Sequence, residues 1–293
     1  MILVTGAGGK TGQAVIQALA AAGAAVRALV YRPEQARLAQ GLGAQQVVVG
    51  DMRDRATVEQ AARGVRAVYH ICPNVSPYEV DMGQAAITAA QSAPVQHFVY
   101  HSVLHPQTEA MPHHWLKLRV EERLFESGLP FTILQPAAYM QNVAAHWDQI
   151  VQRGTYAVPY ATETRLSLVD LQDVAAVAAI VLSEPAHVGA TYELAGTAPL
   201  SPNEVAAILS QQLGFPVGAQ VVPLDRWEQQ ARANGLGDYQ IATLLEMFRY
   251  YERHGLWGNP HVLQWLLGRP PTTLAAAIER WAKGRGPHAV GVG

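Results

Sequence analysis

Cysteine is almost absent from this chain of 293 residues, since Cys72 is the only one. A single cysteine excludes an internal disulfide and suits a reducing compartment, so we expect a cytoplasmic protein. Charged residues are also few, at 15% of the chain, and the formal net charge is −2. This balance offers no electrostatic basis for binding nucleic acid or an anionic membrane surface. No apolar run is long enough to span a bilayer, and we expect no membrane anchor and no signal peptide.

A regularly spaced set of glycines stands near the start of the chain. The apolar segment Met1–Thr5 leads directly into Gly6, Gly9 and Gly12, and a helical pattern follows. In a dinucleotide-binding turn, the first glycine allows the tight exit from the strand and the second lets the pyrophosphate approach the backbone. The third lets the helix pack on the sheet, and the helix N-terminus points free N–H groups at the phosphates. We therefore predict that the cofactor is bound by Gly6, Gly9, Lys10, Thr11 and Gly12.

Short apolar strands alternate with amphipathic helices through the first half of the chain. The predicted strands are Met1–Thr5, Ala25–Tyr31, Gln46–Val49, Ala67–Ile71, His97–His101, Phe131–Leu134 and, later, Thr191–Leu194. The predicted helices between them are Thr11–Ala22, Ala56–Arg63, Val80–Ser92 and Trp115–Ser127. Glycine follows three of these helices, as expected at a helix stop. The alternation predicts an α/β fold of Rossmann type, with a doubly wound parallel sheet and right-handed crossovers.

The alternation stops near residue 145, and the remaining chain is mostly helical. Asp170 can cap one further helix, and Ser201–Glu204 is a capping box with proline at the first helical position. We predict an NAD(P)-binding domain over residues 1–198 and a smaller, mostly helical substrate lobe over residues 199–293. Residues 146–162 are expected to contribute to that lobe.

The end of the second strand favours one form of the cofactor. Proteins that prefer NAD usually carry an acidic residue here for the ribose 2′-hydroxyl, but Leu29–Pro33 contains none. Arg32 can instead pair with a 2′-phosphate, and Lys10 adds a second positive charge, so we predict NADP(H). The alternative is that both bases are solvated surface charges. Asp51 and Met52 follow the third strand and are predicted to lie beside the adenine, although Asp51 could simply cap a helix.

Several segments together resemble one protein family. They are the glycine turn, Val26–Val30 with Arg32, Lys117 with Glu121, Ser127–Pro136, Tyr139–Asn142 and Leu267–Thr273. In these residues the chain resembles the NmrA-like branch of the atypical short-chain dehydrogenase/reductases over almost its whole length. That family includes NADPH-dependent quinone reductases, triphenylmethane-dye reductases and redox-sensing regulators. The resemblance implies a Rossmann domain with a small C-terminal lobe. It also implies that Lys117 bonds the nicotinamide ribose, and that Tyr139 and Asn142 contact the nicotinamide half.

The usual proton donor of short-chain dehydrogenases is missing. These enzymes place a tyrosine four residues before the lysine, whereas His113 stands four residues before Lys117. On a helix the two side chains would share a face, so His113 and Lys117 are candidate catalytic residues, unless the helix starts after His113. Ser102 closes the fifth strand and could orient a substrate carbonyl or only cap the strand. Cys72 ends the fourth strand beside the expected cofactor, where burial as a small apolar residue is the alternative.

Histidines are concentrated between the fifth strand and the following helix. They are His97, His101, His105, His113 and His114. Their spacing matches no familiar metal-ligand motif, so we predict no metal site.

Two functions fit these residues. The first is an NADPH-dependent reductase that passes hydride to a flat, electron-poor acceptor such as a quinone or a dye. Such acceptors need little help from an acid, which suits a site without the tyrosine. The alternative is a non-catalytic NADP(H)-binding redox sensor. We expect a small-molecule substrate, and the choice between monomer and homodimer is left open.

Overall fold

A parallel sheet of seven strands forms the centre of the computed structural model, which describes residues 1–284. The strand order is β10-β6-β5-β4-β1-β2-β3, and every neighbouring pair is parallel. The strands are β1 (Ile2–Val4), β2 (Val26–Val30), β3 (Gln46–Val49), β4 (Ala67–His70), β5 (His97–His101), β6 (Phe131–Pro136) and β10 (Ala190–Leu194). The order reverses at β1, as in a doubly wound Rossmann sheet, so the predicted fold class is confirmed.

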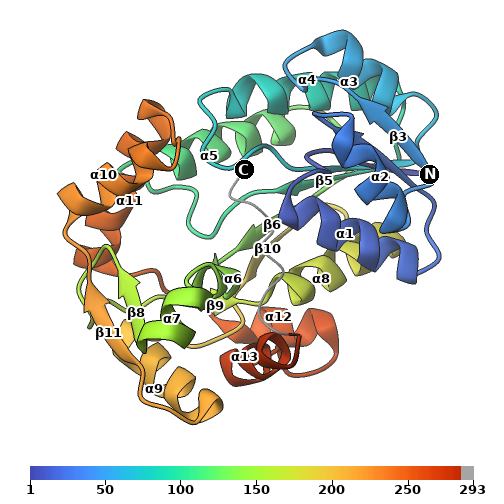
Figure 1. Cartoon of the computed structure of the whole chain (residues 1–293). Helices are drawn as coiled ribbons and strands as arrows, with labels where there is room; N and C mark the ends of the chain where they lie inside the picture. Colours follow the sequence, from blue (N-terminus) through green and yellow to red (C-terminus); the bar gives the residue numbers. More distant parts are fainter. Residues whose placement is uncertain (285–293) are drawn as a thin grey trace.

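Helices cover both faces of this sheet, because successive side chains of each strand point to opposite sides. In β1, Ile2 and Val4 belong to one core layer and Leu3 to the other. The first layer lies under α1 (Lys10–Ala21) and α8 (Leu171–Ser183). The second is covered by α3 (Arg55–Ala62), α4 (Glu79–Ser92) and α5 (Pro112–Phe125) (Figure 1).

The remaining elements lie mainly in the second half of the chain. They are α2 (Glu34–Gly41), β7 (Ala138–Tyr139), α6 (Gln141–Ala144), α7 (Trp147–Arg153), β8 (Thr155–Val158), β9 (Leu168–Val169), η1 (Pro185–His187), α9 (Pro202–Leu213), β11 (Gly218–Val221), α10 (Leu224–Ala233), α11 (Asp238–His254), α12 (Pro260–Leu267) and α13 (Leu274–Lys283). No helix within residues 1–284 combines the length and apolar character needed to cross a membrane.

The C-terminal helices and the middle of the chain pack together. β8 pairs with β11, and a third core cluster joins residues near β8 with residues of α9 and α13. Helix α12 packs instead against α8 and β10 of the central domain. The boundary at residue 198 therefore remains a prediction, and residues 285–293 of the expected lobe lie outside the described part.

Helix starts test several of the local predictions. Asp170 caps α8 and Ser201 forms the expected capping box with Glu204, so both are confirmed. Helix α5 begins at Pro112 and not at Trp115, because proline suits the first helical turn.

Two other local interpretations were wrong. Asp51 does not cap α3, because Asp54 accepts the capping hydrogen bond from Ala56. No helix was expected between the second and third strands, yet α2 forms there. Only Ala39 of α2 is buried, and the helix is polar on average, so few apolar side chains reveal it in the sequence.

Candidate dinucleotide and active site

The three glycines of the turn after β1 differ in whether the surrounding structure requires glycine at that position. Gly6 has φ +56°, and a Cβ atom there would lie 2.7 Å from the Ile71 carbonyl oxygen. A Cβ at Gly12 would lie 2.5 Å from the Gly6 carbonyl oxygen, so α1 can approach the turn only with glycine at this position. At Gly9 the nearest atom would be 3.5 Å away, an ordinary contact. The protein itself therefore does not require Gly9, and the free space there fits a ligand phosphate.

The N-terminus of α1 is left open for an anion. Gly9 is the N-cap and supplies no side-chain hydrogen bond, and the first turn carries no acidic residue. The Gln13 N–H is the first of the helix to bond back, to the Gly9 carbonyl. Within residues 1–284 the N–H groups of Lys10, Thr11 and Gly12 have no backbone acceptor. Free N–H groups and the positive end of the helix dipole are suited to phosphate.

Two of the predicted nicotinamide-side residues lie against this turn. Pairing of β7 with β9 places Tyr139 opposite Val169, and α6 starts two residues later. Thr11 Oγ1 lies 3.4 Å from the Tyr139 hydroxyl, and Lys10 Nζ lies 3.4 Å from Asn142 Oδ1. The structure thus brings the glycine turn together with Tyr139 and Asn142.

A histidine that the sequence did not assign to the site lies beside Tyr139. His101, the last residue of β5, has Nε2 2.7 Å from the Tyr139 hydroxyl and Nδ1 2.5 Å from the Tyr69 hydroxyl. Burial lowers the pKa of His101 to about 3, so the ring is neutral near neutral pH. Its position at the carboxyl end of a central strand was the one available signal, the same that singled out Ser102.

Lys117 is held by a second unpredicted residue. Its ammonium lies 2.9 Å from Glu79 Oε1 and 3.3 Å from the His101 carbonyl oxygen, over the face of Tyr100. Glu79 is buried and also accepts a hydrogen bond of 2.8 Å from the Tyr100 hydroxyl. These contacts hold the positive charge at the carboxyl end of β5, next to the residue that contacts Tyr139. Glu79 starts α4, where an acidic side chain looks in sequence like ordinary helix capping.

His113 lies in the first turn of α5, on the same face as Lys117. Its ring meets the ring of His114 edge-on, with centroids 4.4 Å apart. His113 Nδ1 is buried and has no partner within residues 1–284. Burial lowers the pKa of His113 to about 2, so the ring is neutral and can offer a neutral N–H but not an imidazolium proton. Its role as a proton donor remains a prediction.

Contacts within the protein account for three further predicted site residues, which are Ser102, Cys72 and Met52. The Ser102 hydroxyl donates to buried Glu121, which also accepts from Gln135 Nε2 at 2.9 Å, so its hydrogen is already used. Cys72 Sγ lies 3.4 Å from a nitrogen of His70, and burial raises the pKa of this thiol. Cys72 and Met52 both belong to the core layer under α3 to α5. The cofactor and substrate roles of these three residues remain predictions.

Arg32 and Asp51 follow neighbouring strands, and only Asp51 forms an ion pair within the described residues. Asp51 binds Arg53 through an ion pair of 2.5 Å, which lowers the pKa of that carboxyl. Arg32 is exposed, and its guanidinium has no ion pair within residues 1–284. Its backbone N–H bonds the Gln35 side chain, which fixes the backbone and leaves the charge free. A free guanidinium at this place fits a 2′-phosphate.

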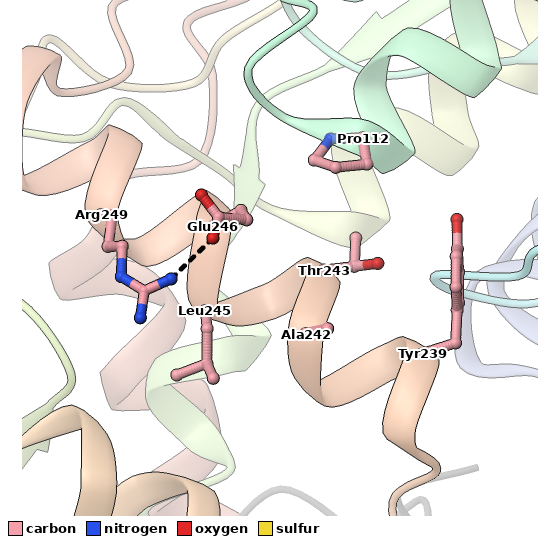
Figure 2. Close-up of a pocket in the computed structure, with 7 residues that line it drawn as sticks. All are labelled: Pro112, Tyr239, Ala242, Thr243, Leu245, Glu246 and Arg249. Atoms are coloured by element: carbon pink, nitrogen blue, oxygen red, sulfur yellow. Dashed lines mark hydrogen bonds and ion pairs between the residues drawn. The ribbon is translucent and has the colours of Figure 1, made fainter.

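A shallow depression of about 380 Å³ lies between the start of α5 and α11. Figure 2 shows Pro112 facing Thr243, with Glu246 and Arg249 paired further along α11. Pro112 directly precedes His113, so the lobe helix α11 borders the segment that carries one candidate catalytic residue.

The reversed strand order, the open helix N-terminus and the three-glycine turn define a dinucleotide-binding protein of Rossmann type. The NmrA-like family matches the chain over residues 1–281, and the protein belongs to that family.

Relatives of this chain include named reductases. An NAD(P)H azoreductase from Xenophilus azovorans is 32% identical over 277 residues, covering 94% of this chain and 96% of that protein. A (4-alkanoyl-5-oxo-2,5-dihydrofuran-3-yl)methyl phosphate reductase from Streptomyces griseus is 35% identical, covering 92% and 94%. The structure of an NADPH-dependent quinone oxidoreductase from Escherichia coli complexed with NADPH has a TM-score of 0.83 and 28% identity, covering 96% and 99%.

Proposed function

We propose that this protein is an NADPH-dependent reductase that transfers hydride to a flat, conjugated acceptor such as a quinone or a dye. It is an NAD(P)H-dependent oxidoreductase, since relatives aligned with more than nine tenths of its length are NAD(P)H-dependent reductases. The observation that carries the choice of NADPH is the unpaired guanidinium of Arg32, where an NAD-binding protein would carry an acid.

The chain holds the cofactor at three places. The N–H groups at the start of α1 bind the phosphates, and Arg32 binds the 2′-phosphate. Tyr139, Asn142 and Lys117 hold the nicotinamide half. When bound, the cofactor supplies the hydride.

Lys117 and the residues around it stabilise the negative charge that develops on the acceptor during hydride transfer. A quinone or azo group that accepts hydride gains negative charge, which a fixed ammonium stabilises. Glu79 and the His101 carbonyl keep the Lys117 ammonium in place, and His113 presents a neutral ring on the same helix face. No tyrosine stands four residues before Lys117, so the site suits acceptors that are reduced without a strong acid. The cytoplasmic location remains a prediction.

The test measures oxidation of NADPH at 340 nm against a panel of quinones and azo and triphenylmethane dyes. NADPH binding is measured in parallel by its fluorescence. We expect steady turnover with at least one conjugated acceptor and none with simple alcohols or ketones. If NADPH binds tightly while no acceptor is reduced, the protein is the non-catalytic redox sensor and the reductase proposal is wrong.

A further inference from the structure

Three aromatic side chains form a row from the core of the sheet to the glycine turn. Tyr69 on β4 contacts His101 on β5, and His101 contacts Tyr139 on β7, at 2.5 and 2.7 Å. Tyr69 is fully buried and His101 is 4% exposed, while Tyr139 is only partly buried and lies next to Thr11. The buried end of the row determines where its hydrogens point.

The Tyr69 hydroxyl has one partner within residues 1–284, which is His101 Nδ1. A buried hydroxyl hydrogen without an acceptor is strongly disfavoured, so Tyr69 donates its hydrogen to Nδ1. A neutral imidazole that accepts at Nδ1 carries its own hydrogen at Nε2. His101 therefore donates from Nε2 to the oxygen of Tyr139, and the hydroxyl hydrogen of Tyr139 points elsewhere.

The other protonation states of His101 fail the same requirement. The Nδ1–H form and the imidazolium form both place a hydrogen between Nδ1 and Tyr69, which leaves the Tyr69 hydrogen in the core without an acceptor. Burial also holds the ring neutral, since it lowers the pKa of His101 to about 3.

The Tyr139 hydrogen is not used within the protein. Besides His101, the Tyr139 hydroxyl has one hydrogen-bond contact within residues 1–284, with Thr11 Oγ1. The distance of 3.4 Å is beyond the usual 2.5–3.0 Å of a hydroxyl hydrogen bond, and Thr11 is the donor in this contact. Tyr139 follows β6, and the sheet order places β6 and β2 on opposite sides of β1. Arg32, at the end of β2, marks the adenosine side, so Tyr139 lies on the nicotinamide side of the open helix N-terminus.

We propose that Tyr69 and His101 are positioning residues that keep the Tyr139 hydroxyl hydrogen free for the phosphate on the nicotinamide side of NADPH. This inference rests on the NADPH binding of the proposed function, but not on turnover. Tyr139 is the residue that touches the cofactor, and the two buried residues act through it.

The first experiment reads the tautomer of His101 in the cofactor-free protein from ring ¹⁵N chemical shifts near neutral pH. The signals that vanish in His101→Gln identify the residue. We expect the Nε2–H form in the wild type and a shift away from it in Tyr69→Phe, where Nδ1 loses its donor. An Nδ1–H or imidazolium form in the wild type would overturn the proposal, whether or not the protein reduces any acceptor.

The second experiment measures binding of NADPH and of adenosine 2′,5′-bisphosphate, which lacks the nicotinamide-side phosphate. Tyr139→Phe should weaken NADPH binding about tenfold to a hundredfold, which is the effect of losing one hydrogen bond to a charged group. It should leave the affinity for the bisphosphate unchanged. Tyr69→Phe should weaken NADPH by a smaller factor. Tyr192 lies on edge strand β10, and its hydroxyl contacts His187 at 3.0 Å. Tyr192→Phe removes this other tyrosine–histidine contact and should change the affinity for neither NADPH nor the bisphosphate.

The outcomes separate the two proposals. If Tyr139→Phe keeps wild-type NADPH affinity, the positioning role is wrong. If the wild type binds no NADPH at all, the proposed function is wrong, while the tautomer of His101 still tests the hydrogen-bond argument. Should Tyr139→Phe fail to fold, the wild-type tautomer and the Tyr69→Phe affinity still decide the matter.

Discussion

Arg32 is the residue on which the choice between the two nicotinamide cofactors depends. Its guanidinium is exposed at the end of β2, and no carboxylate of the described chain neutralises it. Arg53 follows the neighbouring strand β3, but Asp51 already binds it with 2.5 Å between the charged atoms. One free and one occupied arginine at neighbouring strand ends make Arg32 the group available to a 2′-phosphate.

Replacing Arg32 with alanine should weaken NADPH about tenfold to a hundredfold, because one charge-assisted contact to phosphate is lost. NADH has no 2′-phosphate, so its affinity should stay within about twofold. Equilibrium fluorescence titrations with both cofactors measure this, and Arg226→Ala on α10 is the charge-matched control. Equal losses for both cofactors would contradict the assignment.

The residues that organise the site were the hardest to predict. Lys117 could be singled out from a local block, but its partner Glu79 is 38 positions away in sequence. His101 contacts Tyr69 and Tyr139, which are 32 and 38 positions away. Such pairs form because the parallel strands end at one edge of the sheet, where the segments that follow them meet. No spacing rule within the sequence could have revealed them.

At the scale of elements, the junction of β1 and α1 makes the strongest connection between sequence and function. A Cβ at Gly6 or Gly12 would lie under 3 Å from backbone atoms, whereas a Cβ at Gly9 would make only an ordinary contact of 3.5 Å. We therefore expect Gly6 and Gly12 to be needed for folding and Gly9 for binding the cofactor.

Gly12→Ala should lower the free energy of unfolding by about 1–3 kcal/mol, because its Cβ would lie 2.5 Å from the Gly6 carbonyl. Gly9→Ala is the matched variant, with the backbone in the extended region at φ −85°. It should keep the stability within about 0.5 kcal/mol but reduce NADPH affinity. Urea unfolding and fluorescence titration test the pair. Equal destabilisation by both substitutions would refute this separation of roles.

The short strands show what element-level prediction misses. The long alternating segments were expected because their strands are apolar on both faces. Strand β7 has two residues, and it exists only because Ala138 pairs with Leu168 and Tyr139 with Val169. A two-residue strand carries no periodicity, so its partner decides it.

The whole molecule buries several histidines in neutral form. Burial lowers the pKa of His70 and of His101 to about 3, against 6.5 for the free side chain. The unfolded chain therefore binds more protons than the folded one between about pH 3 and 6.5. Linkage then requires stability to fall as the pH falls through this window and to be fully present above it.

We expect the free energy of unfolding to decrease below about pH 6.5, by up to about 1.4 kcal/mol per pH unit for each such histidine. Urea unfolding followed by circular dichroism at several pH values between about 5 and 8 measures the slope. His254→Gln, which removes an exposed histidine of α11, should leave the slope unchanged. A stability that is constant or rises towards pH 5 would contradict neutral burial.

By itself the sequence determined the Rossmann sheet, the glycine turn and the family, because these depend on local periodicity, close glycine spacing and contiguous motifs. The free Arg32 could also be anticipated, since a missing acid is visible in one strand end. Tertiary structure alone decided which groups contact Lys117 and Tyr139, which serine and cysteine are occupied, and how the hydrogens of Tyr69 and His101 point. Those features depend on residues that are distant in sequence and meet only when the parallel strands align.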